Sequence, residues 1–134
     1  MPLVSRKDVL AIAAVVDIAL YSRNRPVAAK ALAARHKLPP RHLETVLQAL
    51  VREGILKGVR GPHGGYALAR DYKRITAEDI LRAARGDEGE VPLPVSSLAN
   101  DVVRPALAEA ERSFSAALHR ITVDDLARAA EKHK

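Results

Sequence analysis

The chain has 134 residues, of which 48% are hydrophobic and only 3% aromatic, so it fits one domain whose core is built from aliphatic side chains. It contains no cysteine, which excludes a disulfide framework, a thiol nucleophile, a cysteine zinc site and a cysteine-ligated iron–sulfur cluster. Residues 1–85 hold 16 Lys and Arg against 7 Asp and Glu, a balance of +9, whereas residues 86–134 hold 6 against 9, a balance of −3. The basic N-terminal part suits a polyanion, although an unevenly charged surface is the simpler alternative.

The N-terminal stretch MPLVSRKDV lacks the apolar segment of a secretory signal. No run of about 18 apolar residues occurs along the chain. We therefore expect a soluble, cytoplasmic protein that does not insert into a membrane.

Two helices are predicted in the first 36 residues. The first covers residues 7–22, with Ser5 as its cap, and ends before Pro26 because the residue before a proline avoids the helical region. The second, rich in alanine, covers residues 27–36. The apolar residues of the first helix share one stripe, formed by Val9, Ile12, Ala13, Val16, Ala19 and Leu20.

A third helix is predicted over residues 41–53, after a break at Leu38-Pro39-Pro40 and before Gly54, a natural C-terminal stop. The short turn between the second and third helices makes a helix-turn-helix pattern, which also occurs in proteins that do not bind DNA. The side chains expected to face inward are Leu43, Val46, Leu47, Leu50 and Val51.

Two short β-prone runs follow, at residues 55–60 and 66–70, and the sequence GPHGG separates them. Glycine and proline at this spacing predict a β-hairpin. Three helices followed by a hairpin make a winged helix-turn-helix, so the predicted fold class is mainly α with one small β-hairpin.

The chain then returns to helix at residues 75–86, capped by Thr76. A long helix is predicted over 100–120, which Pro105 either opens or kinks, and a short one over 121–130. The sequences ITAEDILRAA and ITVDDLARAA resemble each other, and shared cap chemistry explains this better than a true repeat. The expected domains are a DNA-binding winged helix at 1–86, a linker at 87–99 and a helical dimerisation region at 100–134.

In a winged helix the third helix enters the major groove, and the wing lies along the backbone or reaches the minor groove. Arg41 can pair with guanine and Glu44 can accept from cytosine, with Thr45 beside them, while Arg60 stands where an arginine can enter a narrow minor groove. Glu44 alternatively pairs with its helical neighbours. Phosphate contacts are expected from Lys57 and His63 near the wing, and from Arg23, Arg25, Lys30, Arg35 and Lys37 on the preceding segments.

The run REGILKGVRGPHGGYALAR at residues 52–70 resembles the wing signature of the Rrf2 family of bacterial winged-helix regulators. LPPRHLETVLQAL resembles that family's recognition helix, and the similarity extends over residues 7–86. The resemblance implies a homodimer that binds double-stranded DNA at a roughly palindromic operator, and the leading hypothesis is a sequence-specific transcriptional repressor. It implies DNA contacts from Arg41, Glu44, Thr45 and Arg60, and structural roles in the wing for Gly61, Gly64, Gly65 and Tyr66. The long helix, with Leu107, Phe114 and Leu118, would be the main dimer element.

Cluster-sensing members of the family carry three cysteines where this chain reads DEGEVPLPVSSLA. An acidic residue near the N-terminus is a further ligand in some relatives, and Asp8 lies near that place. Without thiolates we expect no iron–sulfur cluster and no other cofactor, so the chain resembles a cysteine-less branch that responds to a small molecule, a protein partner or another signal.

A winged-helix module that binds protein instead of DNA is the main alternative. An enzyme is disfavoured because the serines lie in no G-x-S-x-G setting and GPHGG lacks the ending of a phosphate loop. No metal site is expected, because the five histidines show no metal-binding spacing.

Overall fold

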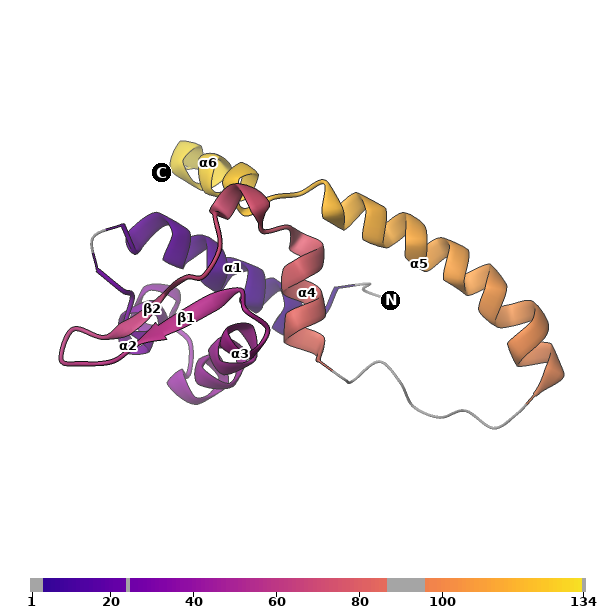
Figure 1. The fold of residues 1–134 in the computed structure, drawn as a ribbon, viewed down its shortest axis with the longest axis horizontal. Coiled ribbons are helices and arrows are strands. Elements are labelled where there is room, and N and C mark those ends of the chain that lie inside the picture. Colours follow the sequence, from indigo (N-terminus) through magenta and orange to yellow (C-terminus); the bar gives the residue numbers. More distant parts are fainter. Residues whose placement is uncertain (1–3, 24, 87–95, 134) are drawn as a thin grey trace.

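A computed structural model describes residues 4–23, 25–86 and 96–133. The described part is mainly helical with one two-stranded antiparallel sheet, which confirms the predicted fold class. Figure 1 shows a body formed by the N-terminal helices and the hairpin, from which one long helix extends. The elements are α1 (Arg6–Tyr21), α2 (Ala29–His36), α3 (Pro40–Arg52), β1 (Leu56–Val59), β2 (Gly65–Leu68), η1 (Tyr72–Arg74), α4 (Ala77–Arg85), η2 (Ala99–Val103), α5 (Arg104–His119) and α6 (Val123–His133).

The predicted caps place the helix starts correctly. Ser5 and Asp8 form a capping box at the start of α1, and Thr76 and Asp79 form another at α4. Pro105 lies in the first turn of α5, directly after the π-helical turns of η2. The expected linker at 87–99 falls mostly outside the described residues, but residues 97–99 are already helical.

One core joins the three N-terminal helices, the hairpin, α4 and the start of α6. Three of the five inward residues predicted for α3 are fully buried and Val46 nearly so, while Val51 is only half-buried. Val123 of α6 belongs to the same core, so the C-terminal segment returns to the N-terminal body. Asp8 and Asp17 are the buried acidic residues within the described ranges.

The apolar stripe predicted for α1 is not the fully buried side of this helix, although Ile12, Val16 and Ala19 of the stripe pack against the margin of the core. The fully buried apolar residues of this helix are Ala11, Ala14, Val15 and Ile18. Val9 of the predicted stripe is 58% exposed, and Ile12 and Val16 are half-buried. The helix is apolar on two sides, so its period alone did not identify the inner one.

The second helix starts two residues later than predicted, because Val27 takes part in the hairpin. The N–H of Val27 donates to the carbonyl of Tyr66 over 2.8 Å, and the N–H of Tyr66 donates back to the carbonyl of Val27 over 2.8 Å. This isolated antiparallel bridge attaches β2 to the chain just before α2.

The two similar sequences lie side by side at the starts of α4 and α6. Thr122 and Asp125 repeat the reciprocal cap bonds of Thr76 and Asp79. The capping segments pair antiparallel, since the N–H of Ala77 donates to Ile121 and that of Val123 donates to Ile75, each over 2.8 Å. Shared cap chemistry therefore accounts for the resemblance.

Candidate nucleic-acid interface

Helix α3 buries one face and presents the other to solvent. Its period and its apolar residues fix the inner face, and a proline in its first turn sets its start. The Thr45 hydroxyl donates to the carbonyl of Arg41 over 3.3 Å, one turn earlier. The outward-facing side chains, all exposed, are Arg41, His42, Glu44, Thr45 and Gln48.

The wing is a short hairpin held close to the start of α2. A side chain at Gly65 would collide with the backbone carbonyl of Val27, and one at Gly64 would collide with the carbonyl oxygen of Val59. Gly61 has φ of +118°, which other residues rarely adopt. Tyr66 is half-buried and packs against the core.

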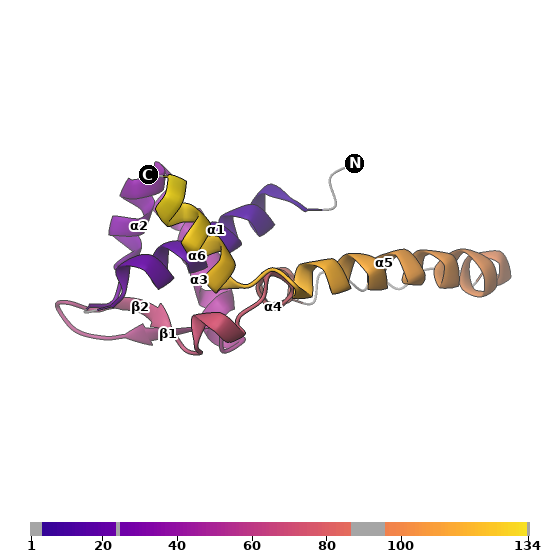
Figure 2. The ribbon, with the colours of Figure 1, turned by 90° about the horizontal axis from the view of Figure 1, so that it is seen from above.

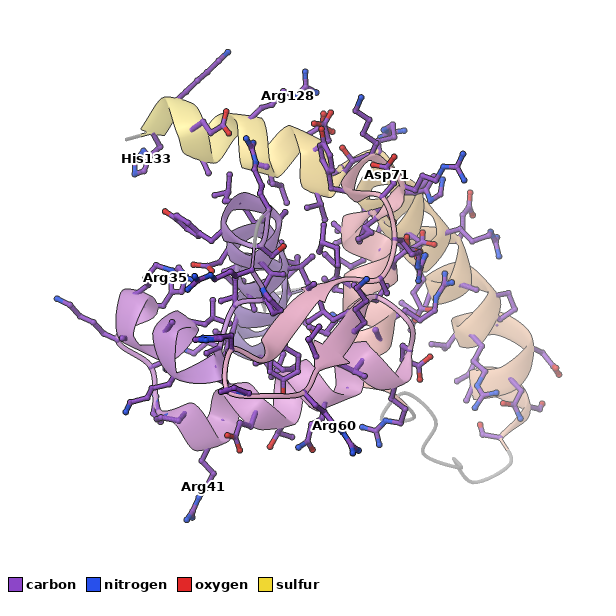
Figure 3. All side chains as sticks on the ribbon, turned by 60° about the vertical axis from the view of Figure 1, so that its left-hand side comes forward. Arg35, Arg41, Arg60, Asp71, Arg128 and His133 are labelled. Atoms are coloured by element: carbon purple, nitrogen blue, oxygen red, sulfur yellow. The ribbon has the colours of Figure 1, made fainter. Side chains whose placement is uncertain are left out.

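Arg60 and Arg41 project from the same side of the molecule, opposite α6 (Figure 3). Arg60 directly follows β1, and its residue is exposed, as is Lys57 within the strand. The helix and the wing thus present their arginines to a common side, the arrangement that a winged helix needs to contact two neighbouring grooves of a duplex.

A hollow of about 320 Å³ lies between the wing and the segment that leads into α2. Arg25 and His63 both line it, so two of the predicted phosphate contacts lie together. Lys30 is exposed on the first turn of α2. Arg25 and His63 therefore place two basic side chains between the wing and the segment before α2.

Arg35 was expected to contact phosphate, but its guanidinium forms an ion pair with a carboxylate of its own chain. It donates through two nitrogens, over 2.9 and 2.7 Å, to the two carboxylate oxygens of the buried Asp17. The same carboxylate lies 2.8 Å from Nε2 of His36, and Arg35 stacks over the ring of Tyr21 at 4.4 Å. These hydrogen bonds to Asp17 raise the pKa of Arg35, and the pair fixes α2 against α1.

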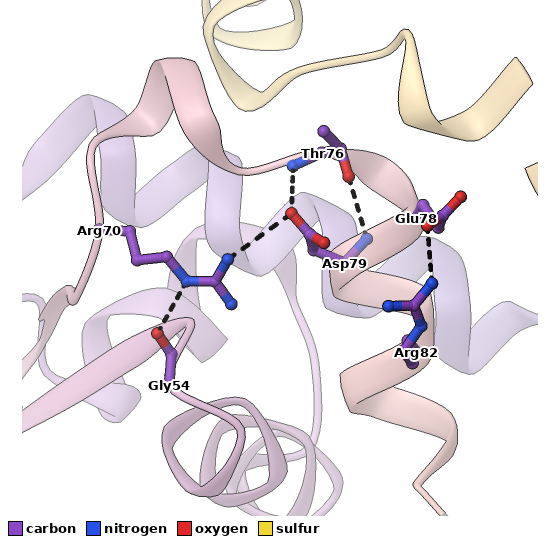
Figure 4. A network of polar contacts seen from close by, with 6 residues as sticks. All are labelled: Gly54, Arg70, Thr76, Glu78, Asp79 and Arg82. Carbon is purple, nitrogen blue, oxygen red and sulfur yellow. Dashed lines mark hydrogen bonds and ion pairs between the residues drawn. The ribbon is translucent and has the colours of Figure 1, made fainter. Parts of the chain in front are cut away.

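Arg70 fixes the base of the wing (Figure 4). Its Nε donates to the carbonyl of Gly54 over 3.2 Å, and its Nη1 lies 3.7 Å from Oδ2 of Asp79. The end of β2 is thereby joined to the turn after α3 and to the cap of α4. In the same figure Arg82 pairs with Glu78 along the surface of α4.

Two further cations adjoin α3 that the sequence reasoning did not single out. Arg6 and Lys7 line a hollow of about 460 Å³ together with His42 and Thr45 of α3. The first turn of α1 therefore lies next to the outward face of the recognition helix. In the sequence these residues appear only as two adjacent basic residues at the start of a helix, and this feature is too common to indicate a binding site.

Asp8 is buried at the junction of α1 and α4. Burial alone would raise its pKa, but hydrogen bonds from Arg85 and Ser5 outweigh that effect and hold the pKa of Asp8 below its ordinary value. Arg85 Nη2 donates to Asp8 Oδ2 over 2.8 Å, and the Ser5 N–H donates to the same oxygen over 2.9 Å. This carboxylate caps a helix and anchors α4 to α1.

The expected dimer residues lie on one side of α5. Phe114 and Leu118 are half-buried and line a hollow beside α4, whereas Leu107 is 58% exposed. None of the 16 residues of α5, all of them described, is buried.

Three helices, a hairpin wing and an exposed basic recognition face define a winged-helix regulator. The Rrf2 family, described as iron-dependent transcriptional regulators, matches residues 4–129. The chain belongs to the Rrf2 family, which confirms the resemblance. Its relatives are transcriptional regulators and not enzymes, as the sequence predicted.

Individual relatives are similar over half to nearly all of the chain. A Synechocystis sp. protein, slr0846, whose name describes an HTH-type transcriptional regulator, is 35% identical over 90% of this chain and 84% of its own. The chain matches only 44% of the length of IscR from Xenorhabdus nematophila, at 36% identity. Among solved structures, IscR of T. potens superposes with a TM-score of 0.78 at 31% identity, covering 99% of this chain and 91% of that one. CymR, the global cysteine regulator of B. subtilis, gives 0.72 at 27% identity, covering 96% and 98%.

The family's iron dependence does not fit the residues of this chain. The sequence has no cysteine to supply thiolates, and Asp8 is already held by Arg85 and Ser5. Within the described ranges, no three His, Asp or Glu side chains form a group that could hold a metal ion. No helix of those ranges is long and apolar enough to cross a membrane.

Proposed function

We propose that this protein is a sequence-specific repressor that binds a roughly palindromic operator as a homodimer. The observation that carries the proposal is the exposure of Arg41 on α3 and Arg60 at the wing on one side of the molecule. Family membership supports DNA binding, since the relatives are transcriptional regulators.

The proposed base contacts come from α3 and the wing. Arg41 pairs with guanine in the major groove, and Glu44 accepts from cytosine N4, with Thr45 beside it. Arg60 enters the adjacent minor groove, where a narrow A·T-rich segment concentrates negative potential. These contacts read sequence, and their loss relaxes specificity at individual base pairs.

The proposed phosphate contacts fix the protein on the duplex. Lys57 and His63 act from the wing, and Lys30 and Arg25 act from the α2 side. Each such contact releases condensed counterions, so binding weakens steeply as salt concentration rises.

A homodimer through α5 presents two copies of this basic side to two half-sites. Leu107, Phe114 and Leu118 are the proposed contact residues, because they form one apolar stripe on a helix with no buried residue of its own. Twofold symmetry of the protein would then match the palindromy of the operator.

The test is binding of the full chain to a fluorescent duplex from the promoter region of its own gene. Arg41→Ala and Arg60→Ala are each expected to weaken binding by about 1–3 kcal/mol. Arg128→Ala is the matched control, since it removes the same charge from α6, on the opposite side (Figure 3). If all three variants bind like the wild type, the groove assignment is wrong. If no promoter duplex binds better than random DNA, a protein-binding role replaces it.

A reporter under that promoter tests the regulatory direction. Repression predicts higher expression when the gene is deleted, and lower expression would indicate an activator.

A further inference from the structure

A hollow of about 480 Å³ lies between α4 and α5, which is within the size range of small-ligand sites. The C-terminal half of α5 lies along α4, and the rest of α5 extends away from the body (Figures 1 and 2). The lining residues come from residues 78–86 on one side and from residues 111–118 on the other. We call this space the α4–α5 hollow.

The wall that α4 forms is basic, because both Arg82 and Arg85 line it. Arg82 Nη2 donates to Glu78 Oε1 over 2.7 Å, but the Arg82 side chain is 73% exposed, and an ion pair at such a surface is weak enough to share its cation. Arg85 holds Asp8, and 45% of the Arg85 side chain is exposed. Guanidinium groups bind carboxylates through paired hydrogen bonds, so this wall suits a carboxylate ligand.

The wall that α5 forms carries the opposite charge. Glu111 and Ser115 lie one turn apart and both line the hollow. Glu111 is exposed and forms no ion pair with any residue that the structure describes. Since α4 leads away from the bridge between Thr76 and Thr122 and α5 leads towards it, Glu111 lies at the same end of the hollow as Arg85. The carboxylate of Glu111 and the hydroxyl oxygen of Ser115 can both accept from an ammonium group.

The space between the two charged walls has an apolar lining. Leu81 of α4 is 3% exposed, and Phe114 and Leu118 of α5 are half-buried. An apolar group of a ligand is removed from water there, and an aromatic ring can stack with Phe114.

We propose that the α4–α5 hollow binds a free α-amino acid with an apolar side chain. Its carboxylate binds Arg82 and Arg85, its ammonium group binds Glu111, and its side chain contacts Phe114 and Leu118. A monocarboxylate or an amine binds less tightly, because each leaves the charged group of one wall without a partner. The site is separate from the DNA-binding side, and only its effect on DNA rests on the proposed function.

Arg85 connects the hollow to the DNA-binding side. Its partner Asp8 lies in the first turn of α1, where Arg6 and Lys7 adjoin α3. A carboxylate that binds Arg85 competes with Asp8, so the first turn of α1 loses part of its attachment to α4. The bound amino acid is therefore expected to lower the affinity for DNA, and DNA to lower the affinity for the amino acid by the same factor.

The test is a calorimetric titration of the full chain, without DNA, with L-phenylalanine and with L-leucine. At least one of them is expected to bind with a dissociation constant between about 1 μM and 1 mM, the usual range for small metabolites. Analogues of the binding amino acid that lack the ammonium group or the carboxylate are expected to bind more weakly than the amino acid itself.

Two variants assign the charged groups of the ligand to the two walls. Glu111→Gln is expected to raise the dissociation constant of the amino acid about 10- to 150-fold, the range of one charge-assisted hydrogen bond, and to leave that of the analogue without an ammonium group unchanged. Arg82→Gln should have the corresponding effect on the amino acid and leave the analogue without a carboxylate unchanged. Glu109→Gln is the matched control, since it removes the same charge from an exposed position of α5 outside the hollow, and it is expected to bind like the wild type.

The proposal is overturned if neither amino acid binds, or if Glu111→Gln binds the amino acid as tightly as the wild type does. These titrations contain no DNA, and neither Glu111 nor Arg82 is a proposed DNA or dimer contact. Failure of the proposed function would therefore leave their result unchanged.

The effect on DNA is measured with the promoter duplex and the amino acid at saturation. The affinity for the duplex is expected to fall about 5- to 150-fold, the usual range of coupling between two sites. Asp8→Asn should remove most of this effect while the amino acid still binds, because the competition for Arg85 is lost. An unchanged affinity for DNA, or an effect of full size in Asp8→Asn, would overturn the coupling through Arg85.

Discussion

Gly65→Ala tests whether the close approach of the wing to the start of α2 orients the wing for DNA binding. The added methyl group would collide with the backbone of Val27, so β2 must move away. The movement breaks the two 2.8 Å hydrogen bonds between Val27 and Tyr66. Each bond contributes about 0.5–1.5 kcal/mol, so the loss is about 1–3 kcal/mol of the free energy of unfolding.

In a chain of this size that loss lowers the melting temperature by roughly 3 to 15 °C, measurable by calorimetry. The displaced wing no longer presents Arg60 to the minor groove. The affinity for the promoter duplex is therefore expected to fall by about 5- to 150-fold, which corresponds to the 1–3 kcal/mol of one specific contact. Adding Arg60→Ala to Gly65→Ala should then cost little more, because its contact is already lost.

Gly58→Ala is the matched control, since a methyl group at that position of β1 meets nothing within 4 Å. It is expected to change neither the melting temperature nor the affinity appreciably. Wild-type stability and affinity in Gly65→Ala would refute the reasoning, because they would mean that β2 and Val27 separate at no cost.

Three further predictions concern buried carboxylates and the basic side. The pKa of Asp8 is lowered in the folded chain, so its pair with Arg85 contributes stability at neutral pH. This stability is lost as pH falls below the unfolded pKa of about 3.9 towards the folded pKa. Asp8→Asn should therefore lower the melting temperature at pH 7 and make the melting temperature decline less steeply in acid, and an unchanged decline would contradict this role. Asp17→Asn removes the charge that holds Arg35 and is expected to cost about 1–3 kcal/mol of stability in urea unfolding, with a wild-type midpoint as the contrary result. Arg6→Ala should reduce the slope of log affinity for DNA against log salt concentration by about 0.9 if Arg6 contacts a phosphate, while an unchanged slope would remove the first turn of α1 from the interface.

The positions of α3, the wing and the start of α4 could be predicted from the sequence, because the residues that determine them are close together in the chain. The break before α3, the glycines of the wing and the cap at Thr76 each depend on residues within a few positions of one another. The inner face of α3 followed from its period, because only one side of that helix is apolar. The exposure of Arg41 and Arg60 follows from these local elements.

The ion pair of Arg35 with Asp17 could not be predicted in this way. Its partner, Asp17, lies 18 residues away on another helix, and an arginine near a helix-turn-helix is also a common phosphate contact. The position of Arg6 and Lys7 beside α3 is similarly a matter of how two helices pack.

The sequence by itself determined the order of the helices, the turn of the wing and, through the lack of cysteine, the loss of the thiolate site. Only the tertiary structure decided which side of α1 faces the core. Both sides of α1 are apolar. A periodic pattern shows that a side of a helix is suited to burial, but it does not show which other element packs against that side.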